Sequence, residues 1–203
     1  MGKNSSDLKN FWIDLETTGL DPRRNGVVQL SAMIEIEGEV VENIDYHIRP
    51  ISGDGVTKRA LEVNMLSIEE IKQFPPAQEI FDKLIAKLKK YIDPYDKQDK
   101  FTFIGYNARF DYDFLRKWME KLNFNWFGSY FWFPPIDIMN LAAFLLRERR
   151  HKIFNFKLET ISALHGLKPT EGLLHNAAFD IELTRDLYRE LIKDANVVNG
   201  HAD

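Results

Sequence analysis

Hydrophobic and polar residues alternate in the stretch FWIDLETTGLDP, residues 11–22. A period of two is typical of a β-strand, so we expect a strand over about 11–17. Asp14 and Glu16 fall on one face of this strand, because successive side chains point to opposite sides. Ile13 and Leu15 fall on the other face, where we expect them to pack into a core.

The remaining pattern predicts a mixed sheet flanked by helices. Further strands are expected over VVQLSAMIEIEG and VVENIDYHIRP, which would form a meander with the first, and over 100–106. Helical spacing or composition predicts helices over 58–73, 75–92, 108–122, 136–150, 157–165 and 177–193. Antiparallel strands followed by alternating helices and strands indicate an α/β fold. We expect one domain over 11–195, a polar segment over 1–10 and a short tail over 196–203.

Two aspartates lie on the apolar sides of their predicted helices. Asp111 is followed by apolar residues at offsets of three, four, seven, eight and eleven, and Asp180 heads a similar stripe. Asp113 and Asp186 lie off these stripes and are interpreted as surface acids.

Together with the pair on the first strand, four carboxylates are thus predicted to face inward. Burying an unpaired charge costs several kcal/mol, and cations that would pair with all four are not evident in the sequence. Each acid alone could be a helix cap or half of a salt bridge. As a set, they favour a site for Mg²⁺ or Mn²⁺.

Three segments carry a family resemblance: DLETTG (14–19), NARFDYDFL (107–115) and HNAAFD (175–180). They are similar, in order, to the three motifs of the DEDDh group of DnaQ-like 3′→5′ exonucleases, which includes polymerase proofreading subunits, RNase T and oligoribonuclease. The resemblance implies a ribonuclease H-like fold with a five-stranded mixed sheet.

The resemblance also implies the catalytic roles. Asp14, Glu16, Asp111 and Asp180 would bind two divalent ions, Mg²⁺ or Mn²⁺, and His175 would be the general base. A sister subgroup has tyrosine where this chain has Asn176. His165, at a predicted helix end before Gly166, is interpreted as a capping or surface residue.

The resemblance extends to substrate contacts, although each residue also has a purely structural explanation. The candidate substrate-binding residues are Thr17, Thr18, Gly19, Leu20, Asn107 and Phe110. Asn107 is equally placed to cap the following helix, and Asp137 is predicted to cap the next. Seven aromatics lie within 123–135; most are expected in the core or at a dimer surface, with one or two left to stack on bases.

Composition limits how the chain could bind nucleic acid and in which compartment it is expected. A net charge of −4 argues against binding nucleic acid through an overall positive field. The cluster RERRHK (147–152) could contact phosphates locally, although such a run is more often a solvated helix end. The chain has no cysteine, and no apolar run approaches the roughly 18 residues of a membrane span. We therefore expect a soluble, intracellular, cytoplasmic protein.

The expected function is metal-dependent 3′→5′ hydrolysis of single-stranded DNA or short RNA, with release of nucleoside 5′-monophosphates. An RNA-trimming enzyme of the oligoribonuclease or RNase T type is the alternative within enzymes. A polymerase proofreading subunit and a non-catalytic nucleic-acid-binding module are further alternatives. The short tail after the last motif favours a free-standing enzyme, and a homodimer stays open. The expected partner is a single strand with a free 3′ end.

Overall fold

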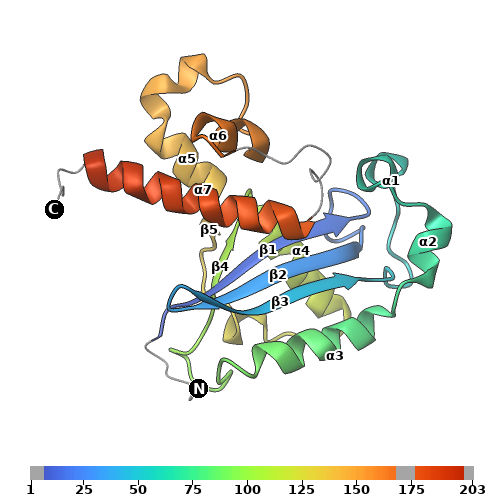
Figure 1. The fold of residues 1–203 in the computed structure, drawn as a ribbon. Helices are drawn as coiled ribbons and strands as arrows, with labels where there is room; N and C mark the ends of the chain where they lie inside the picture. The colour runs from blue at the N-terminus through green and yellow to red at the C-terminus, as the bar shows by residue number, and fades with distance from the viewer. Residues whose placement is uncertain (1–6, 168–176, 199–203) are drawn as a thin grey trace.

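A five-stranded mixed sheet forms the centre of the computed structural model, which describes residues 7–167 and 177–198 (Figure 1). The strand order is β3-β2-β1-β4-β5. The first three strands pair antiparallel, whereas β4 and β5 run parallel to β1. The predicted sheet and its meander are confirmed. The strands are β1 (Lys9–Thr17), β2 (Val27–Ile36), β3 (Glu39–His47), β4 (Thr102–Gly105) and β5 (Ile136–Asp137).

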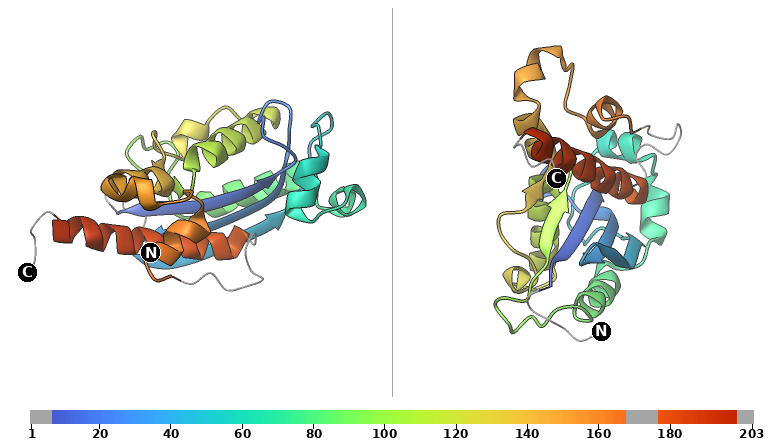
Figure 2. Two further views of the ribbon diagram at one scale, coloured as in Figure 1. Left: turned by 90° about the horizontal axis from the view of Figure 1, so that it is seen from above. Right: turned by 60° about the vertical axis from the view of Figure 1, so that its left-hand side comes forward.

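Helices cover both faces of this sheet (Figure 2). The α-helices are α1 (Lys58–Asn64), α2 (Ile68–Gln73), α3 (Ala77–Leu88), α4 (Ala108–Lys121), α5 (Ile138–Leu145), α6 (Leu158–Leu164) and α7 (Ala177–Val198). Two 3₁₀ helices are η1 (Phe127–Ser129) and η2 (Arg147–Lys152). No helix in the described part of the chain is both long and apolar enough to cross a membrane.

The alternation in β1 feeds two separate cores. Phe11, Ile13 and Leu15 are buried in a large cluster with α3 and α4. Trp12 points to the opposite face, where it is buried with residues of α5, α6 and α7 and meets the Tyr188 ring edge-on at 5.6 Å between centroids. β1 is therefore fixed from both sides, as the central strand of a layered α/β fold must be.

The predicted helix over 58–73 is wrong, because the structure divides it into α1 and α2. Met65 ends α1 in the left-handed conformation, with φ of 52°. Ser67 then begins α2 with a capping box: its hydroxyl accepts from the Glu70 amide, and the Glu70 carboxylate accepts from the Ser67 amide. The S-x-x-E spacing was the readable signal for this break.

The predicted helix over 136–150 is also too long at both ends. Residues 136–137 form β5, and the helix itself ends at Leu145 before the 3₁₀ segment η2. The Asp137 carboxylate accepts from the amides of Met139 and Asn140 at 3.0 and 3.4 Å, so the predicted cap is confirmed.

β1 begins at Lys9, two residues before the predicted start. Lys9 is only 3% exposed, and its ammonium group pairs with Asp99 at 2.6 Å. Asp99 also accepts from the Asp93 amide at 2.8 Å. A charged residue can occupy this buried position because its partner is buried and hydrogen-bonded as well.

Candidate active site

Two acids project from β1 toward α7. Asp14 and Glu16 share the face of the strand that carries Trp12, and this face is covered by α7. Asp180 lies in the first turn of α7. In Figure 1 this helix lies across β1 and β2, with its amino end toward the carboxyl end of β1. A helix amino terminus favours a carboxylate by about 0.3–1 kcal/mol.

The fourth acid reaches β1 from the other layer. Asp111 lies in the first turn of α4, is 3% exposed, and accepts a hydrogen bond from the Leu15 amide at 3.0 Å. Gly105 makes this approach possible, because a Cβ there would lie 3.0 Å from the Ile13 carbonyl oxygen. The β4–α4 turn is thereby pressed against the strand that carries the other two acids.

Each of the four carboxylates is electrostatically coupled to at least one of the others. Burial, followed by the charges of Glu16 and Asp180, raises the pKa of Asp14 to about 8. Burial and the charge of Asp180 raise the pKa of Glu16 to about 7. Burial and Asp14 raise the pKa of Asp111 well above its ordinary value, although the Leu15 amide opposes this.

The donor set fits a hard divalent cation, because all four groups offer carboxylate oxygens and Mg²⁺ and Mn²⁺ prefer such ligands. Within the described residues, no group of three or more histidine or acidic side chains is arranged to hold an ion as it stands.

Of the two histidines considered in the sequence, only His165 lies in the described part of the chain. His175, the predicted general base, lies outside the described residues, as does Asn176. His165 ends α6, with its Nδ1 atom 2.9 Å from the Ile161 carbonyl oxygen. Gly166 follows with φ of 75°. The prediction that His165 lies at a helix end is confirmed.

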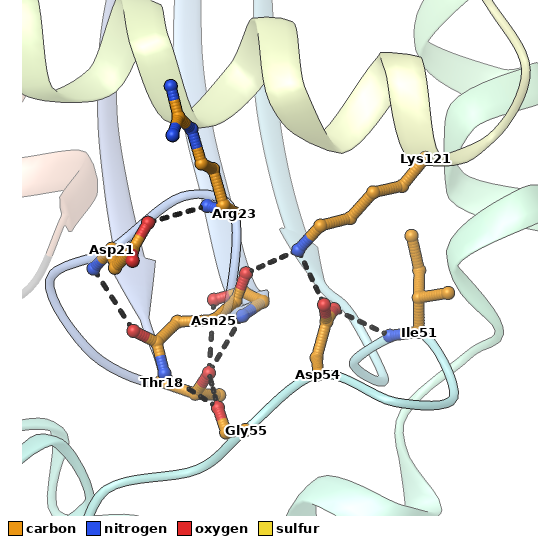
Figure 3. A network of polar contacts seen from close by, with 9 residues as sticks. Thr18, Asp21, Arg23, Asn25, Ile51, Asp54, Gly55 and Lys121 are labelled. Carbon is orange, nitrogen blue, oxygen red and sulfur yellow. Dashed lines mark hydrogen bonds and ion pairs between the residues drawn. The ribbon is translucent and has the colours of Figure 1, made fainter.

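The loop after β1 is fixed by its own polar groups (Figure 3). Thr18 donates its hydroxyl to the Gly55 carbonyl at 2.7 Å and accepts from the Gly26 amide at 2.8 Å. The Thr17 hydroxyl donates to the Gly19 carbonyl at 2.7 Å. Both hydroxyls therefore hold the loop, and a substrate contact by either stays a prediction.

Gly19 is required by a close approach. A Cβ at this position would lie 2.5 Å from the side-chain carbon of Asn25. Asn25 cannot move aside easily, because its amide nitrogen donates to the Gly55 carbonyl and its oxygen accepts from the Asp21 amide. The loop thus closes on itself and leaves Leu20 at its tip, 83% exposed.

Lys121 joins this loop to α4 and was missed by sequence reasoning. Its ammonium group donates to the Asn25 carbonyl at 2.7 Å and pairs with Asp54 at 2.5 Å (Figure 3). Asp54 in turn accepts from the Ile51 amide at 3.1 Å. A lysine in the last turn of a helix ordinarily looks solvated, so the sequence carries no signal for this clamp.

Asn107 and Phe110 lie at the beginning of α4. Asn107 has a left-handed backbone with φ of 61°, and its side chain makes no capping hydrogen bond. Its amide donates to Asp137 at 3.1 Å, and the residue is exposed. Phe110 is half-buried against Phe114, with ring centroids 4.7 Å apart. The capping interpretation of Asn107 is therefore not realised, whereas the substrate contacts of both residues stay predictions.

The aromatic segment divides between core and surface. Phe127, Tyr130 and Phe131 are buried, and Phe124 packs against the same core. The exposed members are Trp126, Trp132 and Phe133. Phe133 lies against Tyr112 and 6.0 Å from the Arg109 guanidinium, in the helical turn that holds Asp111. Which of the seven aromatic residues stacks on a base stays a prediction.

Comparison with protein families settles the relationship. The family model described as "Exonuclease", of the RNase T type, matches residues 11–188, which include all four acids. The chain belongs to this exonuclease family. The relationship to DnaQ-like exonucleases predicted from the motifs is confirmed.

Curated members of the exonuclease family match at modest identity. Ribonuclease T of Wigglesworthia glossinidia brevipalpis is 24% identical over 219 residues, which cover 97% of this chain and 95% of its own length. Oligoribonuclease of Legionella pneumophila (strain Corby) is 27% identical over 164 residues, covering 72% and 76%. The PolC-type DNA polymerase III of Thermotoga petrophila is 25% identical over 182 residues; these cover 89% of this chain but only 12% of the polymerase.

Solved structures of E. coli exonuclease I share the fold. Its zinc-bound complex with single-stranded DNA superposes with a TM-score of 0.70 at 16% identity, covering 95% of this chain and 42% of that one. The complex with a dT13 oligonucleotide gives 0.71 at 17% identity, covering 94% and 42%. The ribonuclease H-like architecture expected of this exonuclease family is confirmed.

The contacts of Lys121 with Asn25 and Asp54, which we call the Lys121 clamp, predict where the backbone becomes more mobile when Lys121 is replaced. In Lys121→Met, amide hydrogen exchange should accelerate about tenfold or more over 18–26 and 51–55, because the loop loses its hold on α4. The matched control is Lys117→Met on the same helix, whose partner is Glu120 within that helix. Equal exchange in the loop of Lys121→Met and wild type would contradict the clamp.

The raised pKa values predict an unusual dependence of stability on pH. Asp14 and Glu16 have pKa values of about 8 and 7 in the folded chain, against ordinary values of 3.8 and 4.5. Between about pH 5 and 8 the folded state therefore binds more protons than the unfolded state, so stability falls as pH rises. Thermal unfolding in EDTA should show a lower Tm at pH 8 than at pH 5.5.

Two variants test the origin of this slope. Asp14→Asn should reduce the fall in Tm with rising pH, because residue 14 then has no carboxyl group to titrate. Asp113→Asn should retain it, because Asp113 is an exposed partner of Arg109. A wild-type Tm that is constant or rises over this range would contradict the assignment.

Proposed function

We propose that the protein is a divalent-cation-dependent 3′→5′ exonuclease acting on single-stranded nucleic acid and releasing nucleoside 5′-monophosphates. The observation that carries this proposal is the meeting of Asp14 and Glu16 with Asp111 and Asp180 in one electrostatic field. Membership in the exonuclease family supports the reaction class.

The four acids would hold two divalent ions, Mg²⁺ or Mn²⁺. When bound, such ions lower the pKa of a water molecule and stabilise charge on the leaving oxygen. The chain itself supplies the rigid frame: β1 fixes Asp14 and Glu16, and the Leu15 amide orients Asp111. We assign His175 to accept the proton of the attacking water, since its ordinary pKa of about 6.5 suits a base near neutral pH.

The substrate's terminal nucleotide would lie between the loop tip and the start of α4. Leu20 offers an exposed apolar side chain for the base. Asn107 offers an exposed amide without a capping bond. The backbone of Thr17, Thr18 and Gly19, held by the hydroxyl bonds described above, would line this position, and Phe110 would border it.

RNA is a second candidate substrate. Ribonuclease T is aligned along 95% of its length, whereas only 12% of the PolC-type polymerase is covered. The acids act on the phosphodiester, which DNA and RNA share, so they do not choose between the two. We keep single-stranded DNA and RNA as the substrate class; assembly with a polymerase or a second copy is a further proposal.

Digestion of matched oligomers tests the proposal directly. A 5′-labelled DNA strand and its RNA counterpart, incubated with Mg²⁺ or Mn²⁺, should give a ladder that shortens from the 3′ end. Asp14→Asn and Glu16→Gln should lower kcat by about a hundredfold or more, because each removes a ligand charge. Asp113→Asn is the matched acid-to-amide control and should cleave like wild type.

Three outcomes separate the alternatives. A wide preference for RNA would identify an exoribonuclease. Near-full activity in Glu16→Gln would contradict the carboxylate site. No mononucleotide release with Mn²⁺ in wild type, together with strand binding, would instead indicate a non-catalytic module.

A further inference from the structure

A basic and aromatic segment projects beyond the sheet at residues 144–157, which we call the basic–aromatic arm. It contains five Lys and Arg residues and one Glu, in a chain whose net charge is −4. Two of its aromatic rings are directed into solvent, since Phe144 is 63% and Phe154 97% exposed. Cations interleaved with exposed rings are typical of surfaces that bind single-stranded nucleic acid.

Stacking contacts organise part of the arm. The Arg147 guanidinium lies 4.9 Å from the centre of the Phe144 ring, and Arg150 lies 4.0 Å from the Phe156 ring. Arg147 is already engaged, since it donates to the Phe144 carbonyl at 3.0 Å and pairs with Glu148 at 3.7 Å. Arg150 forms no ion pair in the described part of the chain, and its stacked guanidinium keeps N–H groups available for phosphate oxygens. Within the described residues, Arg149 and Lys152 form no ion pair within 4 Å, so their charge is available to a ligand.

The arm is tied at both ends to the strand ends beside the acids. The Tyr106 hydroxyl donates to the Phe156 carbonyl at 2.7 Å. On the other side, α5 leads into the arm, and its N-cap Asp137 accepts from the Asn107 amide. Tyr106 and Asn107 form the turn that leads into the first turn of α4 and Asp111. Figure 1 shows α5 and α6 beyond the ends of β4 and β5, beside α7.

We infer that the basic–aromatic arm binds the part of a single strand that lies upstream of the 3′ nucleotide in the active site. Arg149 and Lys152 would contact phosphates, and Phe154 would stack on a base. The inference rests on the proposed function, which requires a strand to leave the acids in some direction. It also resolves the conflict between a net negative chain and a polyanionic substrate, because attraction is local.

A competing path runs along the outer face of α4. A hollow of about 350 Å³ there is lined by Arg23, Arg109, Arg116 and Lys117, among other residues. Three of these cations are already paired, Arg109 with Asp113 and the other two with Glu120. The four cations and the two acids Asp113 and Glu120 leave a net charge of +2 around this hollow. The arm, with five Lys and Arg and one Glu, carries +4, so the arm is the favoured path.

The test compares two triple variants. The arm variant is Arg149→Gln, Lys152→Gln, Phe154→Ala. The control is Lys89→Gln, Lys97→Gln, Tyr95→Ala, which also removes two exposed cations and an exposed ring; Tyr95 is 92% exposed. The control residues lie at the end of α3 and in the loop before β4, at the opposite end of that strand from Tyr106.

Binding is measured by fluorescence anisotropy with labelled oligo-dT and oligo-U of about 15 nucleotides. All proteins carry Asp14→Asn so that the strand stays intact, and the salt concentration is varied. We expect the arm variant to bind about tenfold or more weakly than the parent. The slope of log K against log salt should shrink by about 1.4, for two lost phosphate contacts. The control should match the parent.

Hydrolysis separates this inference from the proposed function. For hydrolysis, Asp14 is kept as in wild type, and the arm variant should then lose about tenfold in kcat/KM on the long oligomer. It should keep wild-type kcat/KM on a dinucleotide, which is too short to reach the arm.

An arm variant that binds and cleaves the long strand like wild type overturns the inference and leaves the proposed function intact. Equal weakening in the control also overturns it, because charge alone would then explain the effect. If wild type cleaves neither substrate, the proposed function fails while anisotropy still tests the arm. Phe154→Ala alone guards against misfolding, since a fully solvated ring contributes little to stability.

Discussion

Repulsion among four carboxylates is the constraint on which the rest of the structure depends. Burial is the largest cause of the raised pKa values of Asp14, Glu16 and Asp111, and the charges of neighbouring acids in the set add to it. Left to themselves, such groups would separate into solvent. They stay together because β1 is held between two hydrophobic cores, one with α3 and α4 and the other with α5, α6 and α7.

α4 connects this site to the loop that borders it. Its first turn presents Asp111, and its last residue, Lys121, holds the loop after β1 through Asn25 and Asp54. One rigid helix therefore sets the distance between the acids and the loop tip at Leu20. Such positioning matters for phosphodiester hydrolysis, in which misplacement by about 1 Å can cost a hundredfold in rate.

Much of the site could be predicted because it follows local periodicity. The period of two placed Asp14 and Glu16 on one face, and the helical period placed Asp111 and Asp180 on inward stripes. Both patterns are properties of neighbouring residues, and the motif order then identified the family. Periodicity predicted four of the strands, and the count of five came from the family resemblance. β5 was not located, because two residues carry no periodicity and β5 is defined by its pairing with β4.

Features that depend on distant partners could not be predicted. Lys9 looked like part of a polar segment but is buried, because Asp99 meets it from 90 residues away. Lys121 resembled a solvated helix end, and its partners come from two different loops. The hydrogen bonds of the Thr18 hydroxyl to Gly26 and Gly55 were not predicted, because these partners lie 8 and 37 residues away. The break at Met65 was readable, since Ser67 and Glu70 form a recognisable capping box.

The central claim is that the repelling carboxylates form a site for divalent cations. Calorimetric titration of Mn²⁺ at pH 7, repeated in buffers of different ionisation enthalpy, tests it most directly. The account predicts saturable binding of two ions with release of protons, because burial and the neighbouring carboxylates raise the pKa of Asp14 to about 8. Asp14→Asn should lose at least one of the two ions. Absence of saturable binding in wild type, or unchanged binding in Asp14→Asn, would contradict the account.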